Sequence, residues 1–134
     1  MIYGIGTDII NSNRIKKIIN KYNDRFINKF FGNEEIEISK TKFNKNLFFS
    51  KRFAAKEAFW KACSPIRLGR IKFKDIQVIS DTRGKPEINI SGDTRKFIEK
   101  VEKSLNNKFH FHISLSDEPP HALAFVIIFL APNQ

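Results

Sequence analysis

Asp8, Glu57 and Lys61 are the residues of this 134-residue chain best suited to chemistry on a phosphate group. Side chains alternate along a strand, so in the opening segment MIYGIGTDII Asp8 shares a face with Gly4 and Gly6, which leave room for a ligand to approach it. Glu57 and Lys61 lie in RFAAKEAFWKA, whose composition predicts a helix. Two oxygen ligands are typical of a Mg²⁺ site that is completed by water and substrate phosphates, and lysine suits phosphate charge. If the two acids converge, the three side chains predict metal-assisted displacement at phosphorus.

Each acid also has a purely structural explanation. Asp8 could cap the helix that follows it or satisfy a turn. Glu57 could form an ion pair with Lys61, four residues later on the same helix, which contributes about 0.3–0.5 kcal/mol on a surface. The sequence leaves both explanations open.

A helical wheel separates the two faces of this central helix. One face is suited to close packing against a sheet or another helix, because its members are small apart from one phenylalanine; they are Ala54, Ala55, Ala58, Phe59 and Ala62. Glu57 falls on the opposite side, together with Phe53, Trp60 and Lys61. Such aromatic neighbours argue against full exposure of the carboxylate.

Three other residues could take part in chemistry. Cys63 is the single cysteine, so it forms no internal disulfide, which agrees with a reducing compartment, and no Cys/His signature marks it as a nucleophile. His110 and His112 could be half of a metal site, but no cysteine or third clustered histidine completes the set. Polar positions on the outward face of a strand are the favoured explanation for them.

The net charge of the chain indicates which kinds of partner to expect. Lys and Arg total 24 and Asp and Glu total 14, a net charge of +10, which favours nucleic acid, phosphorylated metabolites or an acidic protein. A Lys-, Asn- and Ile-rich codon composition is the alternative explanation. A basic nucleic-acid-binding module is disfavoured, because Phe109 and Phe111 alternate with histidines rather than with lysines or arginines.

Nothing in the sequence predicts a membrane partner. No apolar run approaches 18 residues, and the start lacks the basic region of a signal peptide, so we expect a cytoplasmic protein.

The pattern of elements predicts one α+β domain over residues 1–134, with helices packed on one side of a mostly antiparallel sheet. Strands are expected at 1–10, 71–80, 87–91, 108–116 and 122–130, and helices at 13–22, 26–31, 33–39, 47–63 and 93–105. In the first helix, Ile15, Ile18, Ile19 and Tyr22 are expected to face the core. In the last helix, the inward residues are expected to be Phe97, Ile98, Val101 and Leu105.

The motifs GIGTDII, FAAKEAFWKA, RGKP and ISLS, followed by a terminal apolar strand, together resemble holo-[acyl-carrier-protein] synthases, the short bacterial type of 4′-phosphopantetheinyl transferase. The resemblance covers essentially the whole chain in order and length. It implies Mg²⁺-dependent transfer of 4′-phosphopantetheine from coenzyme A to a serine of an acidic apo-acyl carrier protein. Adenosine 3′,5′-bisphosphate is released, and the product supports fatty acid biosynthesis. The resemblance also implies a homotrimer with coenzyme A in clefts between subunits.

By this resemblance, Asp8 and Glu57 bind Mg²⁺, and Lys61 faces the phosphates. Either a water on the metal assisted by Glu57, or Lys61 itself, removes the proton of the attacking serine. The same resemblance implies four further substrate-binding residues, which are Gly84, Lys85, Pro86 and Ser116.

The resemblance also places Arg14 on the helix that meets the carrier protein. Lys17 and Lys21 extend its basic face at i+3 and i+7. We expect this face to contact the acidic partner, and a solvated helix face is the alternative.

Two positions depart from the family pattern. After the central helix, Cys63, Ser64, Pro65 and Ile66 stand where the family usually has a Gly-Thr-Gly turn, so a loop lining the coenzyme A cleft is expected to differ in shape. After ISLS, Asp117 stands where the family usually has histidine. Because an acid beside a polyanion is unfavourable, we expect Asp117 to turn away or to form a salt bridge.

Overall fold

The computed structural model describes residues 1–64 and 71–133 and confirms the α+β fold class. In chain order, its elements are β1 (Ile2–Asn11), α1 (Ser12–Tyr22), α2 (Asp24–Phe30), α3 (Asn33–Ser39), α4 (Lys45–Ala62), η1 (Phe73–Asp75), β2 (Ile76–Ser80), β3 (Pro86–Ile90), α5 (Gly92–Leu105), β4 (Asn107–Glu118) and β5 (His121–Pro132). The loop that was expected to differ at Pro65 and Ile66 lies outside the described residues.

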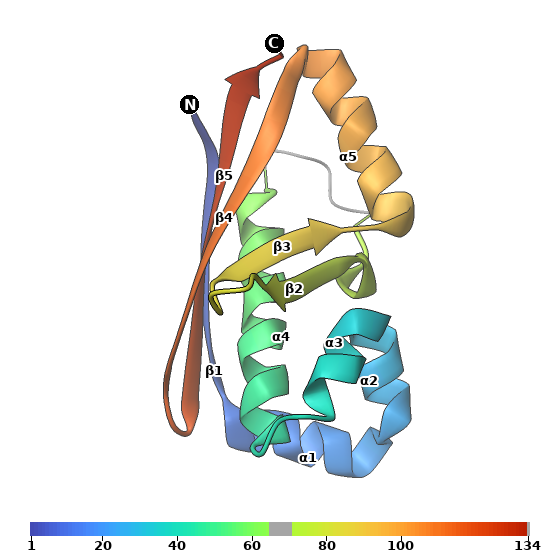
Figure 1. Ribbon diagram of the computed structural model, residues 1–134, viewed down its shortest axis with the longest axis vertical. Coiled ribbons are helices and arrows are strands. Elements are labelled where there is room, and N and C mark those ends of the chain that lie inside the picture. Colours follow the sequence, from blue (N-terminus) through green and yellow to red (C-terminus); the bar gives the residue numbers. More distant parts are fainter. Residues whose placement is uncertain (65–70, 134) are drawn as a thin grey trace.

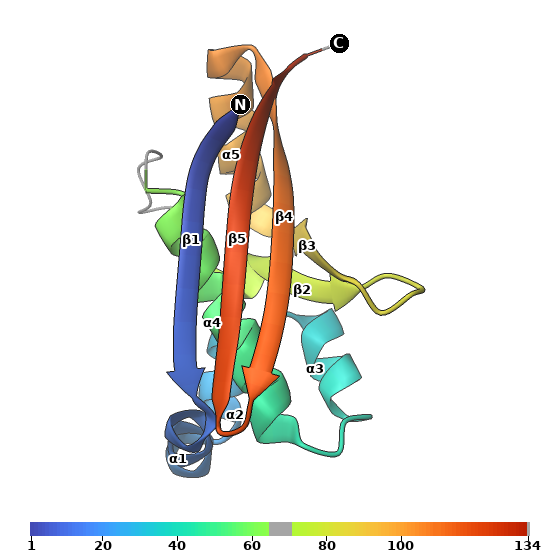
Figure 2. The same ribbon diagram turned by 90° about the vertical axis from the view of Figure 1, so that its left-hand side faces the viewer.

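Two antiparallel sheets frame the central helix. The larger has the strand order β1-β5-β4, and β2 pairs with β3 in a separate hairpin. Helix α4 runs along one face of the larger sheet, while the described helices leave its other face uncovered (Figures 1 and 2). The turn between β2 and β3 projects past β4, on the opposite side of the sheet from β1 (Figure 2). Among the described residues, no helix is long and apolar enough to cross a membrane.

Helix α4 lies unusually close to β1 because two glycines face it. A Cβ atom at Gly4 would lie 1.8 Å from the carbonyl oxygen of Ala62, and one at Gly6 would lie 1.8 Å from that of Ala58. The expectation that these glycines clear space for a ligand was therefore wrong, since α4 itself fills the space. The glycines set the distance between the strand that carries Asp8 and the helix that carries Glu57.

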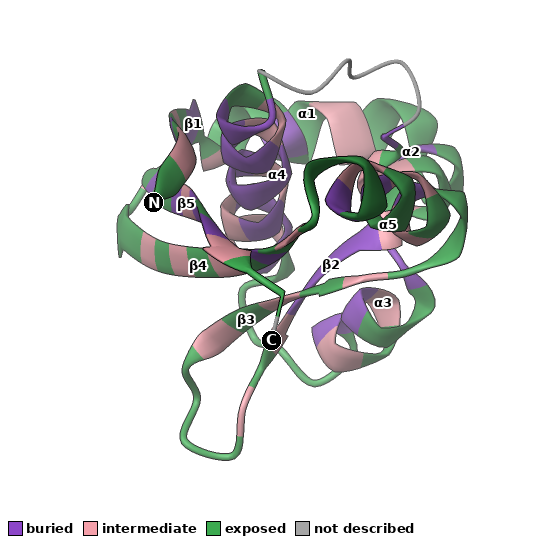
Figure 3. Ribbon diagram, turned by 90° about the horizontal axis from the view of Figure 1, so that it is seen from above, coloured by how far each residue is buried: buried purple, intermediate pink, exposed green. Residues whose placement is uncertain are grey.

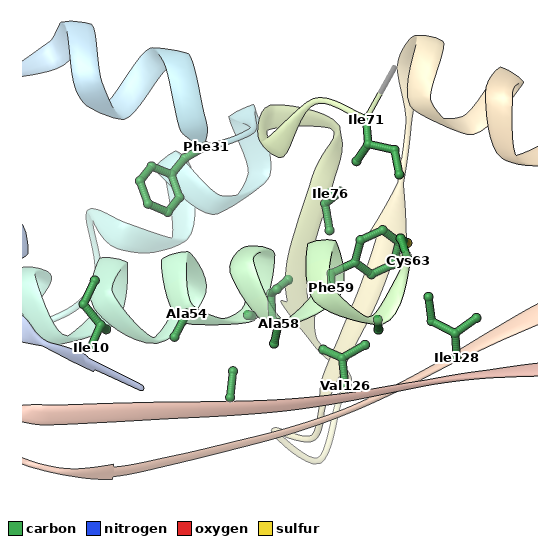
Figure 4. Packing of buried hydrophobic residues seen from close by; sticks show 14 of the residues in the cluster. Ile10, Phe31, Ala54, Ala58, Phe59, Cys63, Ile71, Ile76, Val126 and Ile128 are labelled. Atoms are coloured by element: carbon green, nitrogen blue, oxygen red, sulfur yellow. The ribbon is translucent and has the colours of Figure 1, made fainter. Parts of the chain in front are cut away.

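The alanine face of α4 forms the centre of the core, as its spacing predicted. Ala54, Ala58 and Ala62 are fully buried, and Figure 4 shows the first two directed at the sheet that presents Val126 and Ile128. In Figure 3 helix α4 is mostly buried, whereas the β2–β3 turn is mostly exposed and β4 alternates between exposed and partly buried residues. Small side chains on the helix and larger ones on the sheet thus allow close packing.

On the side of α4 away from the large sheet, a buried ion pair fixes the helix. Lys56 donates to Glu35 Oε1 at 2.7 Å, and both side chains are fully buried. Lys56 also donates to the carbonyl oxygens of Phe73 and Ile76, while Glu35 accepts from the backbone N–H groups of Gly32 and Val78. Such a network is stable only because each buried polar group has partners.

The structure corrects several details of the expected elements. The strand expected at 71–80 is confined to β2, because the preceding residues form η1, where Asp75 accepts hydrogen bonds from the Thr94 side chain and backbone. Helix α4 begins before Leu47, since Asn44 caps it by accepting from the Leu47 N–H. Tyr22 and Leu105, expected in the core, end their helices and are 45% and 39% exposed.

Candidate active site

Asp8 and Lys61 meet between β1 and α4. Lys61 Nζ lies 3.2 Å from Asp8 Oδ1 and donates to the Thr7 carbonyl oxygen at 2.9 Å. The alternative role of Asp8 as a helix cap is excluded, because Asn11 caps α1 by accepting from the Asn13 N–H. Lys61 therefore pairs with a carboxylate on a different element rather than with its helical neighbour Glu57.

Glu57 lies half-buried beside this pair. Burial raises the pKa of Glu57, and the negative charge of Asp8 raises it further, whereas Lys61 and Arg14 act in the opposite direction. Two acids and two bases therefore share one electrostatic environment at the junction of β1, α1 and α4. A carboxylate whose ionised form is disfavoured by its neighbours is typical of a site that expects a cation.

The donor chemistry of this junction fits Mg²⁺. Asp8 and Glu57 supply carboxylate oxygens, which Mg²⁺ prefers, and a cation would relieve the repulsion between them. Within the described residues, no group of three or more His, Cys, Asp and Glu side chains is arranged to bind a metal ion. This excludes a complete protein cage there, including one built on His110 and His112, and leaves the two-carboxylate arrangement.

A basic pocket of about 670 Å³ lies beside the amino-terminal half of α4. It is lined by α4 and the segment before it, by the β2–β3 turn and by β4; its cations are Lys42, Lys51, Arg52 and Lys85. Among the described residues, no acid lines it. We refer to this cavity as the basic pocket; its charge suits a polyanion.

Arg52 gives this pocket a buried charge. This residue is only 6% exposed and stacks on Phe48, with the guanidinium carbon 3.8 Å from the ring centroid. Its Nε atom has no hydrogen-bond partner among the residues that the structure describes. Burial lowers the pKa of Arg52 to about 10, although Glu35 partly offsets this. Because a buried charge is favourable only with a compensating partner, an anionic group bound beside the Arg52 guanidinium would be stabilised.

Three of the four further substrate-binding residues expected from the sequence line this pocket: Gly84, Lys85 and Pro86. Asp81 holds their turn, because its side chain accepts from the N–H groups of Arg83 and Lys85, and Gly84 has a φ of 83°. Ser116 does not join them. It pairs with Leu123 on the outer face of the sheet, where it is exposed.

A single chain does not bring the two groups of residues together. Asp8 lies on β1 at one edge of the larger sheet, whereas the basic pocket lies against β4 at the other edge, with β5 between them (Figure 2). The carboxylates and the pocket could contribute to one site only if a second copy of the chain supplied one of them.

Lys51 and Arg52 were not predicted from the sequence as site residues. A signal was present: the residues three and four positions from Arg52 along the helix are Phe48, Phe49, Ala55 and Lys56, and all of them are buried. An arginine on such a face is expected to be buried and to seek a partner. Asp117, by contrast, was expected either to turn away or to form a salt bridge, and it forms one with Lys51 at 3.1 Å.

The basic stripe of α1 borders an apolar groove of about 420 Å³. The groove is lined by Ile18, Tyr22, Arg25, Phe26, Lys29, Phe30 and Phe53. Arg14, Lys17 and Lys21 are exposed on the same helix that supplies Ile18 and Tyr22. A basic stripe beside an apolar groove suits an acidic partner with an apolar anchor.

The uncovered face of the larger sheet is apolar along β1 and β5. Large side chains on this face are 38–62% exposed; they are Ile5, Ile9, Leu123, Phe125 and Phe129. The pairing of β4 with β5 places His110, His112, Ser114 and Ser116 beside them. An exposed apolar face of this kind marks an interaction surface.

Comparison with known proteins identifies the family. A sequence model described as "4'-phosphopantetheinyl transferase superfamily" matches residues 4–126. The chain belongs to this superfamily. Its resemblance to holo-[acyl-carrier-protein] synthases is thereby confirmed, and an enzyme is favoured over a nucleic-acid-binding module.

Known phosphopantetheinyl transferases resemble this one along nearly its whole length. The holo-[acyl-carrier-protein] synthase of Zymomonas mobilis is 46% identical, over 99% of this chain and 100% of that protein. The crystal structure of the enzyme from Neisseria meningitidis has a TM-score of 0.83 at 33% identity and covers 96% of this chain and 99% of that one. The enzyme from Bacillus anthracis, solved in complex with CoA (3′,5′-ADP), has a TM-score of 0.74 at 32% identity, with 99% of each chain covered.

Proposed function

We propose that this phosphopantetheinyl transferase is a Mg²⁺-dependent holo-[acyl-carrier-protein] synthase. It moves 4′-phosphopantetheine from coenzyme A to a serine of apo-acyl carrier protein and releases adenosine 3′,5′-bisphosphate, a reaction that supports fatty acid biosynthesis in the cytoplasm. The observation that carries the proposal is the meeting of Asp8, Lys61 and Glu57 at the junction of β1 and α4.

Each of these residues has its own role in the proposed reaction. The serine oxygen of the carrier protein attacks the phosphorus attached to pantetheine, and the bond from that phosphorus to the bridging oxygen breaks. Mg²⁺ held by Asp8 and Glu57 would neutralise charge on the pyrophosphate. Lys61 Nζ offsets the negative charge that builds on the leaving group. To do so, it would give up its contact with Asp8 and contact the phosphates instead. The serine proton passes to a base assisted by Glu57, or to Lys61.

The basic pocket is proposed to bind the nucleotide half of coenzyme A. Coenzyme A carries a 3′-phosphate and a pyrophosphate, and the pocket offers four cations, including the buried guanidinium of Arg52. The turn residues Gly84, Lys85 and Pro86 border the same space. The Bacillus anthracis relative was solved with CoA (3′,5′-ADP), which agrees with a nucleotide-binding role.

A homotrimer is proposed to complete the site. The carboxylates and the basic pocket lie at opposite edges of the sheet, and the uncovered face between those edges is apolar. Association of copies through β1 and β5 would bury that face and place the pocket of one subunit beside the carboxylates of the next. Ser116 on the outer face would then lie at the subunit boundary, where it could contact substrate.

The carrier protein is proposed to dock on α1. Arg14, Lys17 and Lys21 attract an acidic surface, and the adjoining groove accepts an apolar side chain from it. Opposed charges raise the rate of association, and salt screens them over about 8 Å at physiological ionic strength.

Mass spectrometry of an apo-acyl carrier protein tests this function. After incubation with the enzyme, coenzyme A and Mg²⁺, the carrier protein should gain the mass of one phosphopantetheine group. Asp8→Asn and Glu57→Gln should each abolish the gain without lowering the melting temperature. The matched variants Asp93→Asn and Glu37→Gln change exposed acids that form surface ion pairs and should retain it. Transfer by Asp8→Asn at the wild-type rate, or none by the wild type, would contradict the proposal.

A further inference from the structure

The ion pair between Lys51 and Asp117 lies at the rim of the basic pocket. Lys51 Nζ is 3.1 Å from Asp117 Oδ2, and the side chains are 28% and 31% exposed. Lys51 lines the pocket from α4, whereas Asp117 reaches it from β4 only through this contact. The pair therefore connects an acid outside the pocket to a cation inside it.

This pair sets Lys51 apart from the other cations of the pocket. Within the described residues, Lys42, Arg52 and Lys85 form no ion pair, so Lys51 is the one pocket cation that is held in direct contact with a carboxylate. A polyanion that enters the pocket must share Lys51 with a carboxylate that also repels it. Partial burial strengthens both effects, because solvent screens the charges less.

We propose that Asp117 limits the affinity of the basic pocket for nucleotides, so that both coenzyme A and the adenosine bisphosphate product are held more weakly than the four cations alone would hold them. The inference rests on the proposed function, because it takes the basic pocket to be the nucleotide site. Its consequence for the enzyme is faster release of a product that carries about as much negative charge as coenzyme A itself.

Neutralising Asp117 and neutralising Lys51 should change the affinity for nucleotides in opposite directions. Asp117→Asn leaves Lys51 uncompensated, so coenzyme A and adenosine 3′,5′-bisphosphate should bind about five to ten times more tightly at low salt. Lys51→Met leaves Asp117 uncompensated, so both ligands should bind more weakly by a similar factor. The double variant removes both charges and should bind within about twofold of the wild type.

Calorimetric titration of the four proteins with each ligand separates this role from a merely structural one. If the pair only held α4 against β4, the three variants would all weaken binding. Glu118→Gln is the matched control, because it removes the same charge from the next residue of β4, which is exposed, and it should change the affinity less than twofold. The gain from Asp117→Asn should also shrink between about 0.05 and 0.5 M salt.

Two results would overturn the inference while leaving the proposed function intact. In the first, the wild-type protein binds coenzyme A and the Asp117→Asn variant binds it no more tightly. In the second, Glu118→Gln raises the affinity for coenzyme A as much as Asp117→Asn does. Wild-type protein that binds neither ligand would overturn the proposed function and this inference with it.

Discussion

Substitution of Gly6 by alanine should damage the fold and the active site together. The new Cβ would lie 1.8 Å from the carbonyl oxygen of Ala58, and a separation of at least 3.0 Å is needed, so α4 must retreat from β1 by about 1.2 Å or more. The obstacle is helix backbone rather than a flexible side chain, so the cost should reach the upper end of the usual range for overpacking, about 3 kcal/mol of the free energy of unfolding.

The same retreat should disrupt the catalytic residues. Lys61 lies 3.2 Å from Asp8, and an added 1.2 Å takes this ion pair beyond contact distance. Displacements of about 1 Å can cost about 10²-fold in rate, so kcat for phosphopantetheine transfer should fall by about that factor in the protein that remains folded. Urea unfolding measures the stability, and transfer kinetics at a temperature well below the melting transition measure the rate.

Gly32→Ala is the matched control. Its Cβ would lie 2.2 Å from the end of the Gln77 side chain, which is buried, accepts from the Glu34 N–H and is remote from Asp8. We expect a loss of about 1 kcal/mol in the free energy of unfolding, with kcat unchanged. A Gly6→Ala protein with wild-type stability and wild-type kcat would refute the reasoning that the glycines position the carboxylates.

Three further predictions concern charges. Burial and the charge of Asp8 raise the pKa of Glu57, so ionisation of Glu57 destabilises the folded protein. Glu57→Gln should therefore raise the melting temperature at pH 8 in the absence of Mg²⁺. This gain should vanish below about pH 4.5, where Glu57 is protonated in the unfolded chain as well. Glu35→Gln leaves Lys56 unpaired in the core and should cost about 3–5 kcal/mol in urea unfolding; a cost below 1 kcal/mol would contradict this. Arg14→Glu with Lys17→Glu should raise KM for the carrier protein far more than KM for coenzyme A; equal changes in both constants would favour a solvated helix face.

The sequence predicted those features that depend on local periodicity. The alanine spacing of α4 predicted its buried face, and the alternation in β4 predicted inward Phe109 and outward His110, because side-chain direction follows directly from helix and strand geometry. The same reasoning placed Glu57 on the side of α4 opposite its alanine face.

Features that depend on tertiary contacts were predicted less well. Gly4 and Gly6 seemed to make room for a ligand because the sequence does not state which element approaches them. The basic pocket escaped prediction because Lys51 and Lys85 come from segments far apart in the chain. Strand residues before Ile76 were assigned to β2 because their alternation gives no sign of the contacts made by Lys56 and Thr94.

The proposed division of the active site between subunits can be tested by complementation. Asp8→Asn protein keeps the basic pocket, and a variant with Arg52→Ala and Lys85→Ala keeps the carboxylates; neither alone should transfer phosphopantetheine. When the two are mixed in equal amounts and allowed to exchange subunits, about one site in four should combine an intact Asp8 with an intact pocket from its neighbour. We therefore expect about a quarter of the wild-type activity to return. A mixture that stays as inactive as its components, although light scattering shows mixed trimers, would contradict a site shared between subunits.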